Sequence, residues 1–172
     1  MQIEGLSVRD NHCFVSVSTD ATIQLGNALG SILNEGDVLV LTGDLGAGKT
    51  QLTKGIASAM GVTTPITSPT FTIQMVHEGL DMPLFHFDLY RLDDSSQLGD
   101  CGLWDVLGYE GVCVIEWGEQ FIDEIGDNRL DVILSRLESE QGEGVEPARC
   151  IQLVSHDARS QEIIDELTKQ LV

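Results

Sequence analysis

Apolar residues along the chain fall into short runs and helically spaced sets, which together predict an alternation of strands and helices. Runs of about five apolar or β-branched residues are typical of strands, and apolar residues that recur every three or four positions are typical of helices. The predicted strands cover residues 12–18, 37–42, 71–77, 84–90, 111–117, 129–137 and 149–155. The predicted helices cover residues 19–33, 51–60, 103–107, 118–125 and 157–172. This order predicts an α/β fold with three layers, in which a sheet lies between helices.

Two pairs of strands follow each other without an intervening helix, which predicts two β-hairpins and therefore a mixed sheet. The first hairpin turns at residues 78–83, and the second surrounds the Gly- and Glu-rich residues 138–147. Residues 1–11 are predicted to be a polar lead, and residues 91–102 an acidic loop with room for a short helix. No long linker divides the chain, so residues 1–172 are predicted to form a single domain with one core.

The strand at residues 37–42 runs into a glycine-rich loop, and the loop runs into a helix. The loop has the pattern G-x-x-x-x-G-K-T, which is typical of a phosphate-binding P-loop in this strand–loop–helix context. Its residues are Gly43, Asp44, Leu45, Gly46, Ala47, Gly48, Lys49 and Thr50. The alternative is a glycine-rich turn with a surface lysine. The context favours a nucleoside triphosphate site.

Each residue type in this loop has a physical role beside a phosphate. Glycine allows the tight path and close approach that a Cβ would block, so backbone N–H groups can surround phosphate oxygens. The N-terminus of the following helix adds positive potential. Lys49 is predicted to reach the β- and γ-phosphates, and the Thr50 hydroxyl is predicted to be a ligand of Mg²⁺.

Two carboxylates stand where apolar strands end, which is the position at which α/β sites are built. Asp88 ends the run at residues 84–87, and Glu116 ends the run at residues 112–115. Either carboxylate could hold Mg²⁺ directly or through water, and the other could orient the attacking water. The alternative for each is a helix N-cap or a salt-bridged surface acid. Both are predicted to take part in catalysis with Lys49.

The loop that contains Thr67 to Thr70 follows the P-loop helix. Its hydroxyl groups could sense a γ-phosphate or its Mg²⁺, or the segment could be a simple turn between a helix and a strand. Arg91 is interpreted as the ion-pair partner of Asp88 or Asp93, although it could also be a charge for the transition state. His77 and His86 are expected to be packed or hydrogen-bonded, because two histidines without a cluster seldom bind metal.

Trp104 and Trp117 are interpreted as core residues, with Trp117 the stronger candidate for a site role because it follows Glu116. The four cysteines stand apart at residues 13, 101, 113 and 150. No C-x-x-C pair occurs, so buried thiols in a reducing cytoplasm are favoured over disulfides or a metal site.

The net charge of −19 argues against a broad basic face for nucleic acid, so a partner would have to hold any RNA. Alternatively, these charges only keep the surface solvated. No apolar run approaches the roughly 18 residues of a membrane span, and the N-terminus has no basic-then-apolar signal pattern. We therefore expect no membrane association.

Four motifs in one order carry a resemblance to a known family. They are the P-loop, T-S-P-T-F-T at residues 67–72, H-F-D-L-Y-R-L at residues 86–92 and I-E-W at residues 115–117. Together they resemble the TsaE (YjeE) family, the ATPase component of bacterial tRNA threonylcarbamoyladenosine synthesis. The resemblance runs from about Thr19 to Trp117, and each later motif alone is weak.

The resemblance implies a small P-loop ATPase that uses ATP and Mg²⁺ and is slow in isolation. It implies that Lys49 and Thr50 serve phosphate and Mg²⁺, that Glu116 serves Mg²⁺, and that Asp88 is the Walker-B-like acid. Thr19 falls where the family contacts the nucleotide near its base. The chain departs from the family by extra length and acidity over residues 141–147, beside hairpin residues such as Arg149 that would contact the nucleotide. Thr70 is also predicted to bind the nucleotide.

The resemblance also implies partners, the TsaB and TsaD proteins, which install the threonylcarbamoyl group on adenosine 37 of tRNA. Three hypotheses follow: an ATPase coupled to this pair, a nucleotide-gated scaffold with incidental hydrolysis, and a small-molecule kinase. The kinase hypothesis is disfavoured because the chain has no arginine-rich segment for an acceptor. The sequence does not separate the first two hypotheses.

Overall fold

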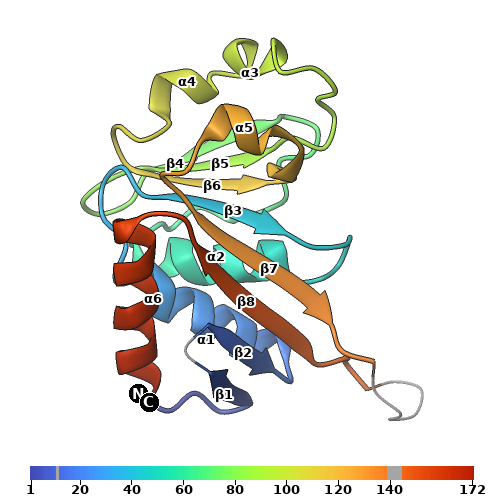
Figure 1. Cartoon of the computed structure of the whole chain (residues 1–172), viewed down its shortest axis with the longest axis vertical. Helices are drawn as coiled ribbons and strands as arrows, with labels where there is room; N and C mark the ends of the chain where they lie inside the picture. The colour runs from blue at the N-terminus through green and yellow to red at the C-terminus, as the bar shows by residue number, and fades with distance from the viewer. Residues whose placement is uncertain (11, 139–144) are drawn as a thin grey trace.

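The computed structural model describes residues 1–10, 12–138 and 145–172, whose strands form one mixed sheet (Figure 1). The strand order is β1-β2-β8-β7-β3-β6-β5-β4. The strands are β1 (Leu6–Asp10), β2 (Cys13–Ser16), β3 (Val38–Thr42), β4 (Gln74–His77), β5 (Leu84–Asp88), β6 (Val112–Glu116), β7 (Leu130–Arg136) and β8 (Arg149–Ser155). The helices are α1 (Thr19–Gly30), α2 (Lys49–Ala59), α3 (Gln97–Asp100), α4 (Leu103–Val106), the 3₁₀ helix η1 (Glu119–Phe121), α5 (Ile122–Ile125) and α6 (Ala158–Leu171).

The centre of the sheet is parallel and both of its edges are antiparallel. Strand β3 pairs in parallel with β6 and with β7, and β6 pairs in parallel with β5. The hairpins β4–β5 and β7–β8 and the strands β2 and β1 add the antiparallel pairs. Because β3, β5 and β6 are parallel, their carboxyl ends lie at the same end of the sheet, where α/β proteins build sites.

Helices cover both faces of the sheet, so the predicted three-layer α/β fold is confirmed (Figure 1). In β3, Leu39 and Leu41 belong to the core cluster shared with α1, α2 and α6, whereas Val38 and Val40 belong to the cluster shared with α3, α4 and α5. This alternation follows from the two-residue period of a strand, and it explains why β3 is apolar at each position from Val38 to Leu41.

Helix α2, which begins in the P-loop, is fixed by a very close contact with α1. A Cβ on Gly55 of α2 would overlap the carbonyl oxygen of Ile23, and a Cβ on Gly26 of α1 would overlap that of Leu52. Glycine is unfavourable inside helices, so its presence at both positions reflects the backbone contact. This contact sets where the N-terminus of α2 lies relative to the sheet.

Several predicted boundaries are wrong. The predicted polar lead contains β1, which pairs with β2 at the edge of the sheet. Helix α1 ends at Gly30, before residue 33, and Ser18 caps it by accepting a hydrogen bond from the Ala21 N–H at 3.0 Å. Strand β4 begins only at Gln74, because Ile73 adopts a left-handed conformation with φ 67°. The predicted helix at residues 118–125 is a 3₁₀ turn followed by a short α-helix.

The cysteines are only partly as predicted. Cys113 is buried, but Cys13, Cys101 and Cys150 are half-buried. Cys13 and Cys150 lie on the paired strands β2 and β8 with their sulfur atoms 3.0 Å apart. Both predicted hairpins are confirmed as antiparallel pairs, although part of the predicted 138–147 connection lies outside the described residues. No helix within the described ranges has the length and apolar content of a membrane span.

Candidate nucleotide-binding site

The P-loop connects the end of β3 to the start of α2 through backbone conformations that favour glycine. Gly48 has φ 112° and immediately precedes the first residue of α2, and Gly46 has φ 76°. L-residues with a Cβ rarely adopt such angles, so these glycines are needed for the path of the loop. The loop therefore presents the N-terminus of an eleven-residue helix to its concave side.

Lys49 is buried and its ammonium group stays inside the loop. Its Nζ donates hydrogen bonds to the carbonyl oxygens of Gly43 and Asp44, the latter at 3.2 Å. Nζ also lies 4.5 Å from the centre of the Trp117 ring, a cation–π contact. Burial lowers the pKa of Lys49, while Glu116 and other carboxylates favour its charged form. The ammonium of Lys49 thus bonds neutral carbonyl oxygens, which phosphate oxygens could replace.

Trp117 reaches Lys49 because of an unusual backbone conformation. Its φ is 59°, a left-handed angle that costs a non-glycine residue about 1–3 kcal/mol. Its ring also packs against Tyr90, with the ring centres 5.1 Å apart. The prediction that Trp117 is the tryptophan with a site role agrees with this position, whereas Trp104 is 42% exposed and is not a core residue as predicted.

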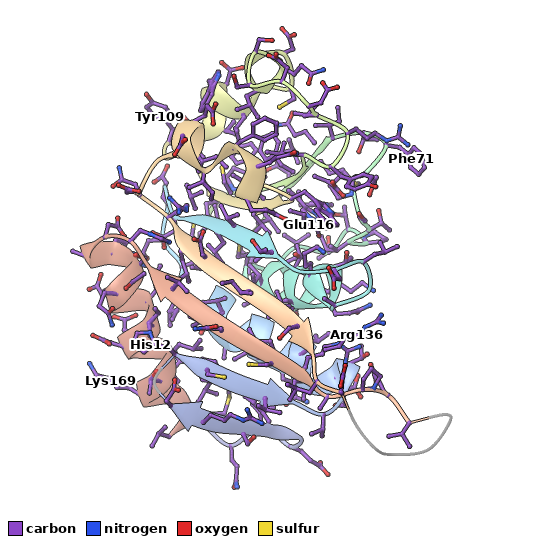
Figure 2. All side chains as sticks on the ribbon, turned by 45° about the vertical axis from the view of Figure 1, so that its right-hand side comes forward. His12, Phe71, Tyr109, Glu116, Arg136 and Lys169 are labelled. Atoms are coloured by element: carbon purple, nitrogen blue, oxygen red, sulfur yellow. The ribbon has the colours of Figure 1, made fainter. Side chains whose placement is uncertain are left out.

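The two predicted carboxylates lie side by side at the carboxyl edge of the sheet. Asp88 pairs with Glu116 in the β5–β6 register, and both are almost fully buried. Glu116 accepts hydrogen bonds from His86 Nε2 at 3.0 Å and from Thr50 Oγ1 at 3.4 Å, both at Oε1. Figure 2 shows Glu116 on the side of the molecule where Phe71 and Arg136 also lie. The structure therefore brings Thr50 of the P-loop into contact with Glu116.

Asp88 organises the loop that contains Thr70. Its Oδ2 accepts hydrogen bonds from Ser68 Oγ at 3.1 Å and Thr70 Oγ1 at 2.8 Å, and its Oδ1 accepts one from the Tyr90 N–H at 3.0 Å. Neither alternative for Asp88, a helix N-cap or a surface acid, describes this buried group. The hydroxyl groups of the loop are thus linked to the carboxylate layer of the site.

His86 of β5 is fully buried and lies within hydrogen-bond distance of Glu116. A carboxylate can only accept a hydrogen bond, so the imidazole donates from Nε2 to Glu116. Nδ1 has no hydrogen-bond partner among the described residues. His77 bonds Thr64 at 2.9 Å, so both histidines are packed and hydrogen-bonded as predicted. The link between His86 and Glu116 was not predicted from the sequence.

These groups line one pocket of about 270 Å³. Its lining residues are Thr19, Leu45, Gly46, Gly48, Lys49, Thr50, Gln51, Ser68, Thr70, Asp88, Glu116, Trp117 and Arg149. Most of the predicted site residues are among them. Gly43, Asp44 and Ala47 are not, because they line a neighbouring hollow with Leu134, Ser135 and Arg136. Ser68 belongs to the loop of residues 67–70 whose hydroxyl groups were predicted as possible sensors, whereas Gln51 was not predicted as a site residue.

Arg149 enters the pocket from the start of β8. It is 7% exposed and packs against the P-loop, since a Cβ on Gly48 would lie 3.2 Å from its Nε. Its Nη2 donates to Glu146 Oε1 at 2.7 Å, and Nε and Nη1 have no partner within the described part of the chain. Arg149 and Lys49 are the cations of the pocket lining.

Arg91 does not make the predicted ion pair with Asp88 or Asp93. Its guanidinium lies over the ring of Phe71, 4.5 Å from the ring centre, and Phe71 is 83% exposed. Asp88 instead satisfies its oxygens with the hydroxyl groups and backbone described above. The guanidinium of Arg91 thus covers one face of the Phe71 ring.

The donor set fits Mg²⁺ held together with a bound nucleotide. No cluster of three or more His, Cys, Asp or Glu side chains suited to a metal occurs in the described residues. Mg²⁺ is typically held by one or two carboxylates, waters and substrate phosphates, and not by a cage made of protein alone. Thr50, Glu116 and Asp88 are oxygen donors of that kind beside the phosphate loop.

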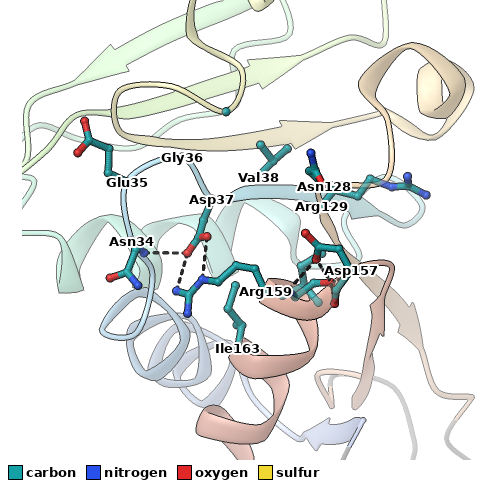
Figure 3. Close-up of a pocket in the computed structure, with 13 residues that line it drawn as sticks. Asn34, Glu35, Gly36, Asp37, Val38, Asn128, Arg129, Asp157, Arg159 and Ile163 are labelled. Carbon is teal, nitrogen blue, oxygen red and sulfur yellow. Dashed lines mark hydrogen bonds and ion pairs between the residues drawn. The ribbon is translucent and has the colours of Figure 1, made fainter.

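A second, larger pocket of about 430 Å³ lies at the amino end of β3, away from the P-loop (Figure 3). Figure 3 shows Arg159 of α6 directed at Asp37, which precedes β3. Asp37 accepts two hydrogen bonds from Arg159, from Nε at 3.0 Å and Nη2 at 2.8 Å, and one from the Asn34 N–H at 2.7 Å. This ion pair joins α6 to the start of the P-loop strand.

Comparison with known proteins identifies the family. The model of a family described as "Threonylcarbamoyl adenosine biosynthesis protein TsaE" matches residues 16–144. The tRNA threonylcarbamoyladenosine biosynthesis protein TsaE of Bacillus subtilis is 37% identical over 128 residues, which cover 74% of this chain and 80% of that protein. The protein of the same name from Treponema pallidum is 42% identical over 120 residues, which cover 70% of this chain and 88% of that protein.

A solved structure has a similar fold. The crystal structure of YdiB from Bacillus subtilis superposes with a TM-score of 0.76 at 29% identity. The match covers 92% of this chain and 94% of that one. The family match spans the P-loop, Asp88 and Glu116, so it includes most of the pocket described above. The chain therefore belongs to the TsaE family of threonylcarbamoyl adenosine biosynthesis proteins.

Proposed function

We propose that this protein is a Mg²⁺-dependent P-loop ATPase that serves tRNA threonylcarbamoyladenosine formation at adenosine 37 by coupling ATP binding and hydrolysis to a TsaB–TsaD complex. The observation that carries the proposal is the contact between Thr50 of the P-loop and Glu116 of β6. It joins a phosphate-binding loop to a buried carboxylate, which is the arrangement that a Mg²⁺–nucleotide complex requires. The family membership supports the role in tRNA modification.

Different residues of the pocket would have different roles in the transfer of the γ-phosphate to water. Backbone N–H groups of the P-loop and the N-terminus of α2 bind phosphate oxygens. Lys49 exchanges the carbonyl oxygens of Gly43 and Asp44 for phosphate oxygens. Thr50, Glu116 and Asp88 are the groups that would hold Mg²⁺, which neutralises phosphate charge when it is bound. Of the two carboxylates, Glu116 is nearer the P-loop because it contacts Thr50.

The loop with Ser68 and Thr70 supplies a means of sensing the nucleotide. Both hydroxyl groups bond Asp88, so a change in the partners of Asp88 on nucleotide binding changes the bonds that hold the loop. The same loop carries Phe71, whose side chain is exposed and which Figure 2 shows on the same side of the molecule as Glu116. The nucleotide state would thereby reach a surface that a partner protein can contact.

The acidic chain is suited to a subunit that leaves tRNA to its partners. Its net charge is −19, so long-range electrostatics oppose direct tRNA binding. We place its action in the cytoplasm because tRNA modification takes place there. A nucleotide-gated scaffold uses the same pocket, and the two functions differ in whether hydrolysis is needed.

The experiment compares nucleotide binding, phosphate release and association with purified TsaB–TsaD. The wild-type chain is expected to bind ATP with Mg²⁺, hydrolyse it slowly, and associate with the pair in an ATP-dependent way. Lys49→Ala is expected to lose nucleotide binding, whereas Lys54→Ala, an exposed lysine of the same helix, is the matched control. Glu116→Ala is expected to lower hydrolysis by about 100-fold or more while binding is kept.

Three outcomes would contradict parts of the proposal. Normal hydrolysis by Glu116→Ala would refute the assignment of Glu116. Full tRNA modification by a complex that contains a hydrolysis-deficient variant would favour the scaffold. Phosphorylation of a metabolite without ATP-dependent association would favour a kinase.

A further inference from the structure

One side chain, Glu146, joins two residues of the nucleotide pocket from opposite parts of the chain. Its Oε1 accepts a hydrogen bond from Thr19 Oγ1, and its Oε2 accepts one from the Thr19 N–H at 3.2 Å. Oε1 also accepts from Arg149 Nη2 at 2.7 Å. Thr19 begins α1 and Arg149 begins β8, so the carboxylate connects the first helix to the last strand.

The donors that Glu146 occupies belong to the pocket of the P-loop. Thr19 and Arg149 line the same pocket as Gly48, Lys49 and Thr50. The guanidinium of Arg149 packs against Gly48, is more than nine-tenths buried, and has two nitrogens without a partner among the described residues. A buried cation with unused donors beside a phosphate loop indicates an anionic ligand. Glu146 supplies an anion to one side of that cation.

We propose that Glu146 competes with the nucleotide for Thr19 and Arg149, so that nucleotide binding must break the Thr19–Glu146–Arg149 bridge. Glu146 would then lower the affinity of the pocket for the nucleotide. This inference rests on the proposed function, because it assumes a nucleotide in the P-loop pocket.

Charge and exposure support competition over a shared site. A triphosphate brings further negative charge to the pocket, and Glu146 would repel it across the same guanidinium. Hydrogen bonds from Thr19 and Arg149 lower the pKa of Glu146, so its carboxylate is ionised near neutral pH. The side chain of Glu146 is 41% exposed, whereas that of Arg149 is 9% exposed. Glu146 can therefore turn to solvent when Arg149 finds another anion, and Arg149 stays in place.

The test measures Kd for a fluorescent ATP analogue with Mg²⁺ in the full chain. Glu146→Ala is expected to lower Kd by about three- to tenfold, the range of an ion pair that is partly exposed. Glu146→Gln, which keeps the side-chain length without the charge, is expected to give part of that gain. Glu138→Ala is the matched control, because Glu138 is an exposed acid of the same β7–β8 connection and its removal changes the net charge equally.

Double variants test whether the gain in nucleotide affinity depends on the Thr19–Glu146–Arg149 bridge. In an Arg149→Ala background, Glu146→Ala is expected to lower Kd by less than twofold, since the main shared donor is gone. Inorganic tripolyphosphate, used as a competitor, separates the phosphates from the rest of the nucleotide. A gain for tripolyphosphate as well as ATP supports competition at Arg149, and a gain for ATP alone supports competition at Thr19.

The outcomes separate the inference from the proposed function. Wild-type binding that Lys49→Ala abolishes, together with an unchanged or raised Kd in Glu146→Ala, overturns the inference and leaves the function standing. An equal fall of Kd in Glu138→Ala also overturns it, because the effect is then one of net charge. Absence of binding in both wild-type and Glu146→Ala chains overturns the proposed function and the inference together. Melting temperatures of all variants identify any that fail to fold.

Discussion

The ion pair between Asp37 and Arg159 offers a sharp test of how this fold is held together. The perturbation is Arg159→Met, which keeps most of the aliphatic stem and removes the charge and the hydrogen bonds. Asp37 is 7% exposed and would lose two of its three hydrogen-bond donors. Arg159 would also release the carbonyl oxygen of Ile32, to which Nη2 donates at 2.9 Å.

The size of the effect follows from the burial of the carboxylate that remains. Removal of one partner of a buried ion pair costs about 3–5 kcal/mol, because the other charge is left without a partner. Asp37 keeps the bond from the Asn34 N–H, and the side chain of Arg159 is 28% exposed, so water can reach part of the site. We therefore expect a loss of about 2–4 kcal/mol in the free energy of unfolding.

The dependence on pH has a definite sign. Hydrogen bonds to Asp37 raise the pKa of Arg159 above its ordinary value. A raised pKa in the folded state gives a stabilisation that is fully present below the unfolded value and lost only as pH rises through the folded value. Arg159 is therefore charged at both pH 7 and pH 9, and the loss caused by Arg159→Met should be the same at these two pH values.

The assay is urea unfolding followed by circular dichroism and tryptophan fluorescence. Glu162→Ala is the matched control, since Glu162 is the 57% exposed second partner of Arg159, and its removal should cost at most about 1 kcal/mol. A loss for Arg159→Met within 0.5 kcal/mol of the control, a threshold on the order of additivity error, would refute the reasoning. Coincident transitions with both probes would also support the single domain predicted for residues 1–172.

Two further predictions concern the site and its supporting helix. His86→Gln keeps a donor for Glu116 and should retain Mg²⁺-dependent hydrolysis within about tenfold. His86→Phe has no donor and should lower kcat by about 100-fold with an unchanged Kd for ATP. Equal kcat values for the two variants, or equal losses of ATP binding, would show that His86 does not position Glu116. Gly55→Ala should destabilise the fold by more than about 3 kcal/mol, because the new methyl group would overlap the Ile23 carbonyl oxygen. Gly99→Ala, where the nearest atom is a Trp104 ring carbon at 3.4 Å, should have a much smaller effect on the melting temperature, and similar effects for both variants would contradict the close contact between α1 and α2.

Local chemistry decided the features that could be predicted from the sequence. The P-loop is readable because its strand, its glycines and the N-terminus of its helix are consecutive in the chain. The carboxylates Asp88 and Glu116 are readable because an apolar run that ends in an acid marks the end of a buried strand. The TsaE family was recognisable from the order of these motifs, and the family model confirmed it. Strand β1 was missed because an edge strand with an exposed face has no continuous apolar run.

Tertiary structure alone decided which of these residues meet. The strand order places β6 between β3 and β5, and only this order puts Glu116 beside both Thr50 and Asp88. The same holds for the bridge from Thr19 to Glu146, which spans 127 residues. It holds also for Arg91, which lies over Phe71 and does not pair with Asp88 or Asp93 as predicted. Strand pairing and side-chain contacts of this kind depend on groups far apart in the chain, and the local spacing of residues does not specify them.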